Sequence, residues 1–300
     1  MDPPVAPIWV DRALGLSAKS SAGSKFEEIR VESAETEELS FLRASIRGAG
    51  GFTDTEFGSA VERVYVRLAE ELRRRARVPL RFWNYVPNIR ASSRNGFSRY
   101  EVFNAGRFSG YRAWYGTDEF APGLVASSGI GHRGEDFEIH LLGGVRAGTP
   151  LENPRQRPAY RYSRRYGDHP PCFARATVLE DPLGAEYGPR SVIVSGTASI
   201  IGEDSRHEGN LDEQVRETLG NLGRLSALVA GESRDSEDLP RALARYREIR
   251  AYVVHDEHLS EVHAMLERAF PNVTEIEVAS VDLCRPELLF EAEGVMVCEG

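Results

Sequence analysis

The chain has 300 residues, a formal net charge of −9 at pH 7 and a sequence pI near 5.4, so its surface as a whole repels the phosphates of nucleic acids. Hydrophobic residues make up 41% of the chain and charged residues 28%, which is typical of a globular protein with one large or two ordinary domains. The sequence has no long apolar run and no secretory pattern, and its three cysteines lie too far apart to suggest a disulfide framework. We therefore expect a cytoplasmic protein without a membrane segment or a nucleic-acid partner.

The first half of the chain predicts an alternation of strands and helices. Residues 1–25 combine several prolines with a run of small polar residues, which predicts a flexible N-terminal arm. Residues 26–33 alternate in part, as a strand does, and residues 56–75 repeat apolar side chains every three or four positions, as a helix does. We further expect a strand over residues 80–89, a helix over 98–115, and then two strands around a turn.

The second half predicts the same order of elements. A β-rich run over residues 191–200, an amphipathic helix over 210–229, a strand over 249–256 and a helix over 258–270 are followed by two C-terminal strands. Strand, helix, strand, helix, strand, strand therefore occurs twice. This repetition indicates a duplicated α+β unit with its helices packed on one sheet face.

The charge of the chain reverses locally between Glu152 and Ala176. This stretch holds only two acids, Glu152 and Asp168, but it is rich in arginine and tyrosine: Arg155, Arg157, Tyr160, Arg161, Tyr162, Arg164, Arg165, Tyr166 and Arg175. The guanidinium fork binds a carboxylate through two hydrogen bonds, and the tyrosine hydroxyl adds directional bonds. The sequence therefore predicts a pocket for a small polyanion.

The same stretch contains the motifs PRQ, AYRY, RRYG and FARA, whose order resembles the chorismatases. These enzymes cleave chorismate into pyruvate and a six-membered carbocyclic acid. Four further blocks are similar to the same family: NYVPNI at 84–89, RYEVFNAGR at 99–107, SGTASIIG at 195–202 and CRPELLFEAEG at 284–294. The resemblance covers the chain from about residue 83 to its C-terminus.

The resemblance also implies a fold. The C-terminal unit looks like the RidA/YjgF (chorismate-mutase-like) fold, whose members are trimers with sites in the clefts between subunits. Chorismatases resemble a fused, single-chain version with the site between modules. We therefore expect tandem RidA/YjgF-like modules with helices packed on mixed β-sheets, in a pseudo-oligomeric single chain that is a monomer. The N-terminal or central module is placed at residues 26–150 and the C-terminal catalytic module at residues 151–300.

Two glutamates near the C-terminus, Glu291 and Glu293, point to one face of a predicted strand. Taken alone, such a pair is more often a solvated sheet edge than a catalytic site. In the family, the general acid lies seven residues after the cysteine or alanine of a C-x-P motif, and Cys284 plus seven gives Glu291. The resemblance implies that Glu291 protonates the methylene carbon of the enolpyruvyl ether. Burial beside Phe290 would raise its pKa towards the operating pH.

Two further positions imply the product. Glycine in the SGTAS strand together with cysteine in the C-x-P motif resembles the branch that makes 3-hydroxybenzoate, and here the pair is Gly196 and Cys284. Alanine at both positions marks the branch that hydrolyses chorismate to trans-3,4-dihydroxycyclohexa-1,5-diene carboxylate. The resemblance therefore favours 3-hydroxybenzoate and pyruvate as the products.

Chorismate carries two carboxylates, so two cationic clamps are expected. Arg155 and Arg165 are the first candidates, and a regular strand over residues 159–165 would direct Tyr160 and Arg165 to opposite faces. Phe173 falls where the RidA fold lines its ligand cleft, so we expect it to pack on the carbocycle. The residues expected to bind the substrate are Arg155, Arg165, Tyr160, Arg107, Arg175 and Phe173.

No cofactor and no metal are expected. The histidines at 255, 258 and 263 match no ligand spacing, and the Gly-rich run at 128–134 lacks the spacings of nucleotide-binding loops. Three alternatives to the favoured activity stay open: the hydrolytic chorismatase branch, an enamine or imine deaminase of the RidA type, and a non-catalytic RidA-like protein that binds an aromatic acid.

Overall fold

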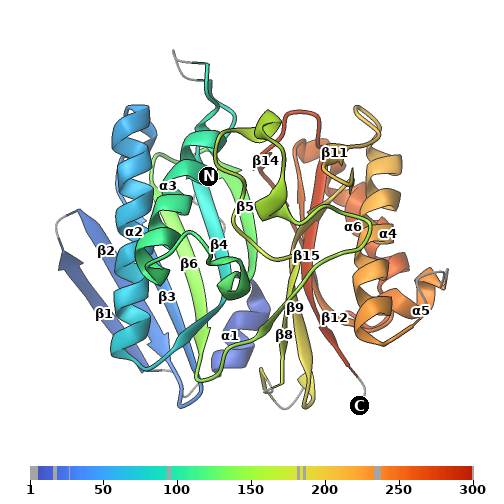
Figure 1. Cartoon of the computed structure of the whole chain (residues 1–300). Coiled ribbons are helices and arrows are strands. Elements are labelled where there is room, and N and C mark those ends of the chain that lie inside the picture. The colour runs from blue at the N-terminus through green and yellow to red at the C-terminus, as the bar shows by residue number, and fades with distance from the viewer. Residues whose placement is uncertain are drawn as a thin grey trace.

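The computed structural model describes residues 6–15, 19–26, 28–92, 96–180, 183–184, 187–232 and 238–298. These residues form two β-sheets that lie side by side, and the long helices cover the outer faces of the sheets (Figure 1). The chain crosses from the first sheet to the second between β6 and β7.

The first module consists of one sheet and two long helices. Its strands are β1 (Lys19–Phe26), β2 (Ile29–Glu35), β3 (Leu39–Ile46), β4 (Val78–Pro87), β5 (Ala126–His132) and β6 (Phe137–Gly144), and its helices are α2 (Asp54–Arg74) and α3 (Arg99–Tyr115). Short 3-10 turns are formed by η1 (Ala49–Gly51) and η2 (Ala121–Gly123). The sheet has the order β1-β2-β3-β6-β4-β5, and the short strand β14 (Asp282–Leu283) of the C-terminal half joins it beside β5.

Local sequence signals explain where the two helices begin. The Thr53 side chain accepts a bond from the backbone N–H of Glu56 while the Glu56 carboxylate binds back to Thr53, and Ser98 and Glu101 repeat this capping box in α3. The apolar stripe of α2 then packs against the sheet in the first hydrophobic core.

The second module repeats the arrangement. Its strands are β7 (Thr149–Leu151), β8 (Ala176–Leu179), β9 (Ser191–Ala198), β12 (Tyr246–Val253), β13 (Ile276–Ser280) and β15 (Phe290–Val297), and its helices are α4 (Leu211–Val229), α5 (Leu239–Leu243) and α6 (Leu259–Ala269). A separate two-stranded ribbon pairs β10 (Ile200–Ile201) with β11 (Asp204–Ser205), and the 3-10 turn η6 (Asp256–His258) precedes α6.

The strand orders of the two sheets demonstrate the duplication. The second sheet has the order β7-β8-β9-β15-β12-β13, which corresponds strand for strand to β1-β2-β3-β6-β4-β5 of the first. In each module the strand between the two long helices pairs in parallel with the strand after the second helix, as β4 with β5 and β12 with β13. The predicted α+β fold of two tandem modules, with helices packed on mixed sheets, is confirmed.

The N-terminal residues depart from the prediction. Residues 1–25 were expected to form a flexible arm, but within the described part of that segment the chain forms helix α1 (Ile8–Leu14) and most of strand β1. Trp9 and Val10 are buried, and the Trp9 ring lies 5.9 Å from that of Trp83 and 6.5 Å from that of Tyr187. Helix α1 thereby packs into the core between the two sheets, a long-range contact that local composition does not reveal.

Strand β5 of the first module lies against the second module. The backbone N–H of Ala126 donates to Thr177 Oγ1 at 2.7 Å, and that of Ser127 donates to Ser195 Oγ at 2.8 Å. These bonds, together with β14, join the modules along one seam. Among the helices that the structure describes, none is long and apolar enough to span a bilayer.

Candidate active site

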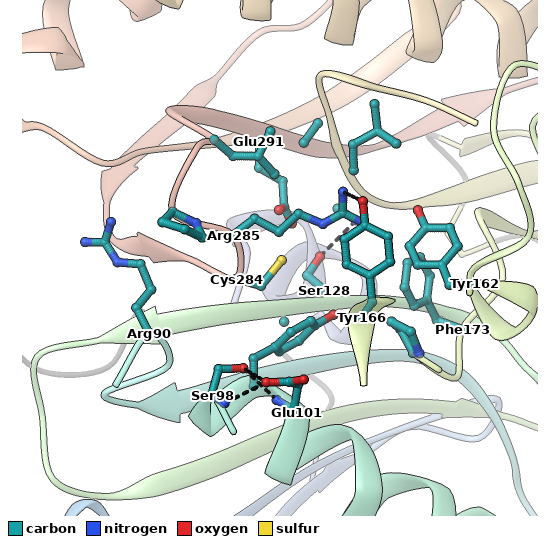
Figure 2. Close-up of a pocket in the computed structure, with 18 of the residues that line it drawn as sticks. Arg90, Ser98, Glu101, Ser128, Tyr162, Tyr166, Phe173, Cys284, Arg285 and Glu291 are labelled. Atoms are coloured by element: carbon teal, nitrogen blue, oxygen red, sulfur yellow. Dashed lines mark hydrogen bonds between the residues drawn. The ribbon is translucent and has the colours of Figure 1, made fainter. Parts of the chain in front are cut away.

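A cavity of about 340 Å³ lies at this seam, within the size range of small-molecule sites. Its walls come from both modules: α3 and β5 on one side, β9 and the residues from 284 to 291 on the other, with the chain between β7 and β8 closing it (Figure 2). The residues that line it include Tyr100, Arg107, Ser128, Tyr162, Arg165, Tyr166, Phe173, Arg175, Gly196, Cys284, Arg285 and Glu291.

Glu291 is the buried acid among the described residues that line this cavity. Its side chain extends from β15, the residue is only 6% exposed, and its carboxyl has no hydrogen-bond partner among the described residues. Burial, together with the negative charge of Glu293, raises the pKa of Glu291 to about 8. A carboxyl group that keeps its proton near neutral pH can act as a general acid.

Gly196 provides the space that Glu291 occupies. A Cβ atom added at Gly196 would lie 1.9 Å from Glu291 Oε1 and 2.9 Å from Ser128 Oγ. Atoms cannot approach so closely, so any side chain at this position would displace the acid. The glycine of β9 is therefore a steric requirement of the arrangement.

Cys284 faces the same space from the turn before β15, and Figure 2 shows its sulfur between Arg285 and Ser128. Burial and the nearby charge of Glu291 raise the pKa of its thiol to about 12. A cysteine activated as a nucleophile has a lowered pKa, so Cys284 is present as a neutral thiol with a weak S–H donor.

Three buried arginines make the cavity electropositive. Arg107, Arg175 and Arg285 are 1%, 2% and 7% exposed, and none has a carboxylate within 4.0 Å in the described part of the chain. A buried cation without an anion is costly, so an anionic ligand that supplies the missing charge is bound favourably.

Neutral groups fix the directions of these arginines. Arg107 Nη2 donates to Asn104 Oδ1 at 2.7 Å, and Arg175 Nη2 donates to the Tyr162 hydroxyl at 2.6 Å. Arg285 extends along the cavity to the Tyr166 hydroxyl, at 3.2 Å, with its guanidinium 4.0 Å from the centre of the Tyr166 ring (Figure 2). The guanidinium groups are thus held in place before any ligand arrives.

Of the site residues predicted from the sequence, seven line the cavity: Glu291, Cys284, Gly196, Arg107, Arg165, Arg175 and Phe173. Arg165 lies at its mouth, with a 55% exposed side chain that forms an ion pair with Asp204. Arg155 and Tyr160 lie outside the lining. The Arg155 guanidinium forms an ion pair with Glu217 at 2.5 Å, and Tyr160 packs against the core of the first module.

The predicted strand over residues 159–165 is wrong. Here the chain forms two 3-10 turns, η3 (Ala159–Arg161) and η4 (Arg164–Tyr166), between Pro158 and Gly167, a backbone that does not alternate sides. Tyr162, Arg165 and Tyr166 consequently line one cavity together. The flanking proline and glycine were the available signal for turns.

Sequence reasoning also missed Arg285 and Ser128. Arg285 directly follows Cys284 in the CRP motif, and this position beside a predicted site residue could have been used to predict that Arg285 lines the cavity. Ser128 had no such signal, because the pairing of β5 with the second module is a long-range feature.

Comparisons with known proteins identify relatives of this chain. Residues 17–143 match the family model described as chorismatase FkbO/Hyg5-like, N-terminal. A 3-hydroxybenzoate synthase of Streptomyces hygroscopicus is 32% identical over 299 residues, which are 98% of this chain and 82% of the relative. A chorismatase of Streptomyces rapamycinicus is 34% identical over 220 residues, which are 72% of this chain and 63% of the relative.

A solved structure shares the fold. The crystal structure of a chorismatase at 1.08 Å resolution superposes with a TM-score of 0.76 at 24% sequence identity, over 93% of this chain and 80% of that chain. The 32% identity to a relative over 98% of this chain and 82% of that relative shows that the chain belongs to the chorismatase family.

Proposed function

We propose that this protein converts chorismate into 3-hydroxybenzoate and pyruvate without a cofactor. The observation that carries the proposal is the position of Glu291, a buried acid with a pKa of about 8, against Gly196 and beside Cys284. The relative that is 32% identical over 98% of this chain carries the name 3-hydroxybenzoate synthase. The three buried arginines supply more than the two positive charges that the carboxylates of chorismate require.

The reaction begins with a proton transfer from Glu291 to the methylene carbon of the enolpyruvyl ether, which gives an oxocarbenium ion. The ring hydroxyl next to the ether carbon then attacks that carbon and displaces the pyruvyl oxygen, so pyruvate leaves and an epoxide-like intermediate forms. The hydroxyl proton returns to Glu291, and the intermediate isomerises to the aromatic ring of 3-hydroxybenzoate. The atoms of chorismate equal those of the two products, so water is not consumed.

The cavity supports this path by positioning. The arginine clamps hold the carboxylates and Phe173 packs on the ring, so that the hydroxyl and the ether carbon remain in near-attack geometry. The neutral Cys284 thiol is positioned to donate a hydrogen bond to the oxygen of the intermediate.

The test is turnover of chorismate in ¹⁸O-labelled water, with mass spectrometry of the ring product. We expect unlabelled 3-hydroxybenzoate, because its hydroxyl oxygen comes from the ring of the substrate. The pyruvate is not diagnostic, since its ketone oxygen exchanges with water. A dihydrodiol acid in place of 3-hydroxybenzoate would retain the family and replace the proposed product by that of the hydrolytic branch; its ring oxygens would also be unlabelled, because water attacks the oxocarbenium carbon of the pyruvyl group. Untouched chorismate would contradict the proposed activity.

The pH dependence follows from the same acid. Glu291 donates a proton only while it is protonated, so the rate of chorismate turnover should fall as the pH rises through about 8. The measurement is kcat and kcat/KM over a series of buffers at constant ionic strength. A rate that increased over the same range would show that the rate-limiting group acts as a base.

A further inference from the structure

Glu293 lies two residues beyond Glu291 on β15, and residues of the other module hold its carboxylate. Arg81 Nη2 donates to Glu293 Oε2 at 2.6 Å, and Trp83 Nε1 donates to Oε1 at 2.7 Å. Glu293 is 3% exposed and the Arg81 side chain 1%, so this is a buried ion pair across the seam between the modules. Such a pair is costly to assemble for stability alone.

Ser128 connects Glu293 to the Gly196 backbone, against which Glu291 packs. Its hydroxyl donates to Glu293 Oε2 and accepts a 3.0 Å bond from the backbone N–H of Gly196. Gly196 is the residue whose missing side chain leaves space for Glu291. Arg81 Nη2 also donates to Ser128 Oγ, at 2.5 Å. The Arg81–Glu293 pair therefore fixes the Ser128 hydroxyl, and the hydroxyl fixes the backbone against which Glu291 packs.

The duplicated module provides an internal comparison. Glu138 of β6 pairs with Tyr85 across the sheet, as Glu291 of β15 pairs with Tyr252. Two residues further along, His140 stands where the second module has Glu293. The two glutamates thus occupy equivalent positions in equivalent strands.

The hydrogen-bond donors and charges around Glu138 and Glu291 differ. Arg43, at the β3 position that corresponds to Gly196, binds both oxygens of Glu138, at 2.8 and 2.7 Å. His140 Nε2 lies 3.3 Å from the same carboxylate and donates to it, because an ionised carboxylate only accepts. Burial opposes ionisation, but these bonds lower the pKa of Glu138 to about 2, whereas Glu291 has no such donor.

Several charged and titratable groups face Glu291 from the elements packed around it. Burial and Glu293 raise its pKa, and the positive charges of Arg81, Arg175 and Arg285 oppose them. Cys284 and Tyr100 also face it, and burial raises the pKa of each, so both are neutral. Burial is thus the largest cause of the raised pKa, and the negative charge of Glu293 adds to it against the arginines that the substrate requires.

We propose that Glu293 is a positioning residue for the acid: it holds Ser128 and the Gly196 backbone against Glu291, and it keeps a fixed negative charge beside that side chain. The inference rests on the proposed function, since it assigns Glu291 the role of proton donor. Glu293 itself does not touch the substrate cavity; it acts through Ser128 and through its charge.

The test is Glu293→Gln, which removes the charge at constant size. Loss of the anion and the uncompensated field of Arg81 both favour ionised Glu291, so the alkaline limb of the kcat profile should move to lower pH by about 1 pH unit or more. The same group can be titrated by infrared spectroscopy through its protonated carboxyl C=O band, which is assigned by its loss in Glu291→Gln. The pH midpoint of this titration should fall by the same amount. Ser128→Ala keeps the charge, so its midpoint should stay in place while kcat falls.

Glu248→Gln is the matched control. Glu248 is a buried glutamate of β12 that forms an ion pair with Arg12 and accepts from Tyr187 at 2.9 Å, outside the cavity. The Glu248→Gln variant also loses a buried glutamate and its ion pair, although the Arg12 side chain is 31% exposed, and the midpoint of Glu291 should not move in this variant. If Glu293→Gln fails to fold, the double variant with Arg81→Met removes both buried charges, and its midpoint should still fall, by a smaller amount.

Two results distinguish the inference from the proposed function. An unchanged midpoint in Glu293→Gln, by both kinetics and infrared titration, would overturn the role of Glu293 while the enzyme remained a chorismate-converting one. Absence of turnover in the wild type would instead contradict the proposed function, and the infrared titration would still measure what Glu293 does to Glu291.

Discussion

Replacing Glu291 by glutamine should lower the rate of chorismate turnover by about 10²- to 10⁴-fold, the usual contribution of a general acid, and leave chorismate binding nearly intact. Glutamine preserves the shape of the side chain against Gly196 but has no acidic proton to give to carbon. The measurements are single-turnover kinetics for the rate and calorimetry for binding. Equal turnover by the variant would show that another group protonates the enol ether.

The stability of the same variant provides the control for folding. The folded-state pKa of Glu291 is raised from 4.5 to about 8, so its contribution to stability is full below the unfolded value and is lost as the pH rises through about 8. Glutamine does not titrate. The thermal midpoint of the variant should therefore exceed that of the wild type increasingly between these two pH values, and a variant that was less stable throughout would point to a packing defect.

Replacing Arg285 by methionine should raise KM for chorismate by about 10- to 10²-fold, the loss expected for hydrogen bonds to a charged group. Arg285 is buried in the cavity wall, stacks on Tyr166 and has no carboxylate partner among the described residues, so the substrate is the anion that balances it. Lysine at this position keeps the charge and loses the planar fork, and should give an intermediate KM. Initial rates over a range of chorismate concentrations measure both.

Arg155→Met is the matched control for this prediction. Arg155 was a first candidate from the sequence, but its guanidinium is already neutralised by Glu217 and bonded to Asn221 outside the cavity. Its loss should leave KM close to the wild-type value. A large rise in KM for this variant, with none for Arg285→Met, would favour the sequence-based assignment over the one drawn from the cavity.

Regular elements could be predicted from the sequence because their signals are local. The apolar stripe and capping residues of α2 lie within its own span, and so do the β-rich residues of β9. The N-terminal helix α1 could not be recognised in the same way, because its burial depends on Trp83 and Tyr187, far along the chain. Its seven residues carry too little periodicity to stand out.

The residues of the candidate site also differ in whether a local sequence signal or a long-range contact reveals them. Glu291, Cys284 and Gly196 were accessible because short motifs resembling the family contain them. The arginines could not be ordered by position alone, since only tertiary structure decides which guanidinium meets an acid, as Arg155 meets Glu217, and which faces the cavity, as Arg285 does.

The fusion of two like modules into one chain has a consequence for what the fold can accommodate. In a homo-oligomer one gene sets every copy of an interface residue, so a change that favours chemistry is imposed on all sites at once. Here the two copies of one position are free to differ. Glu138 forms an ion pair with Arg43, and Glu291 has no ion-pair partner among the described residues and a pKa raised to about 8. Because the two modules need not be identical, one glutamate can form an ion pair while the equivalent glutamate remains without one for the proposed chemistry.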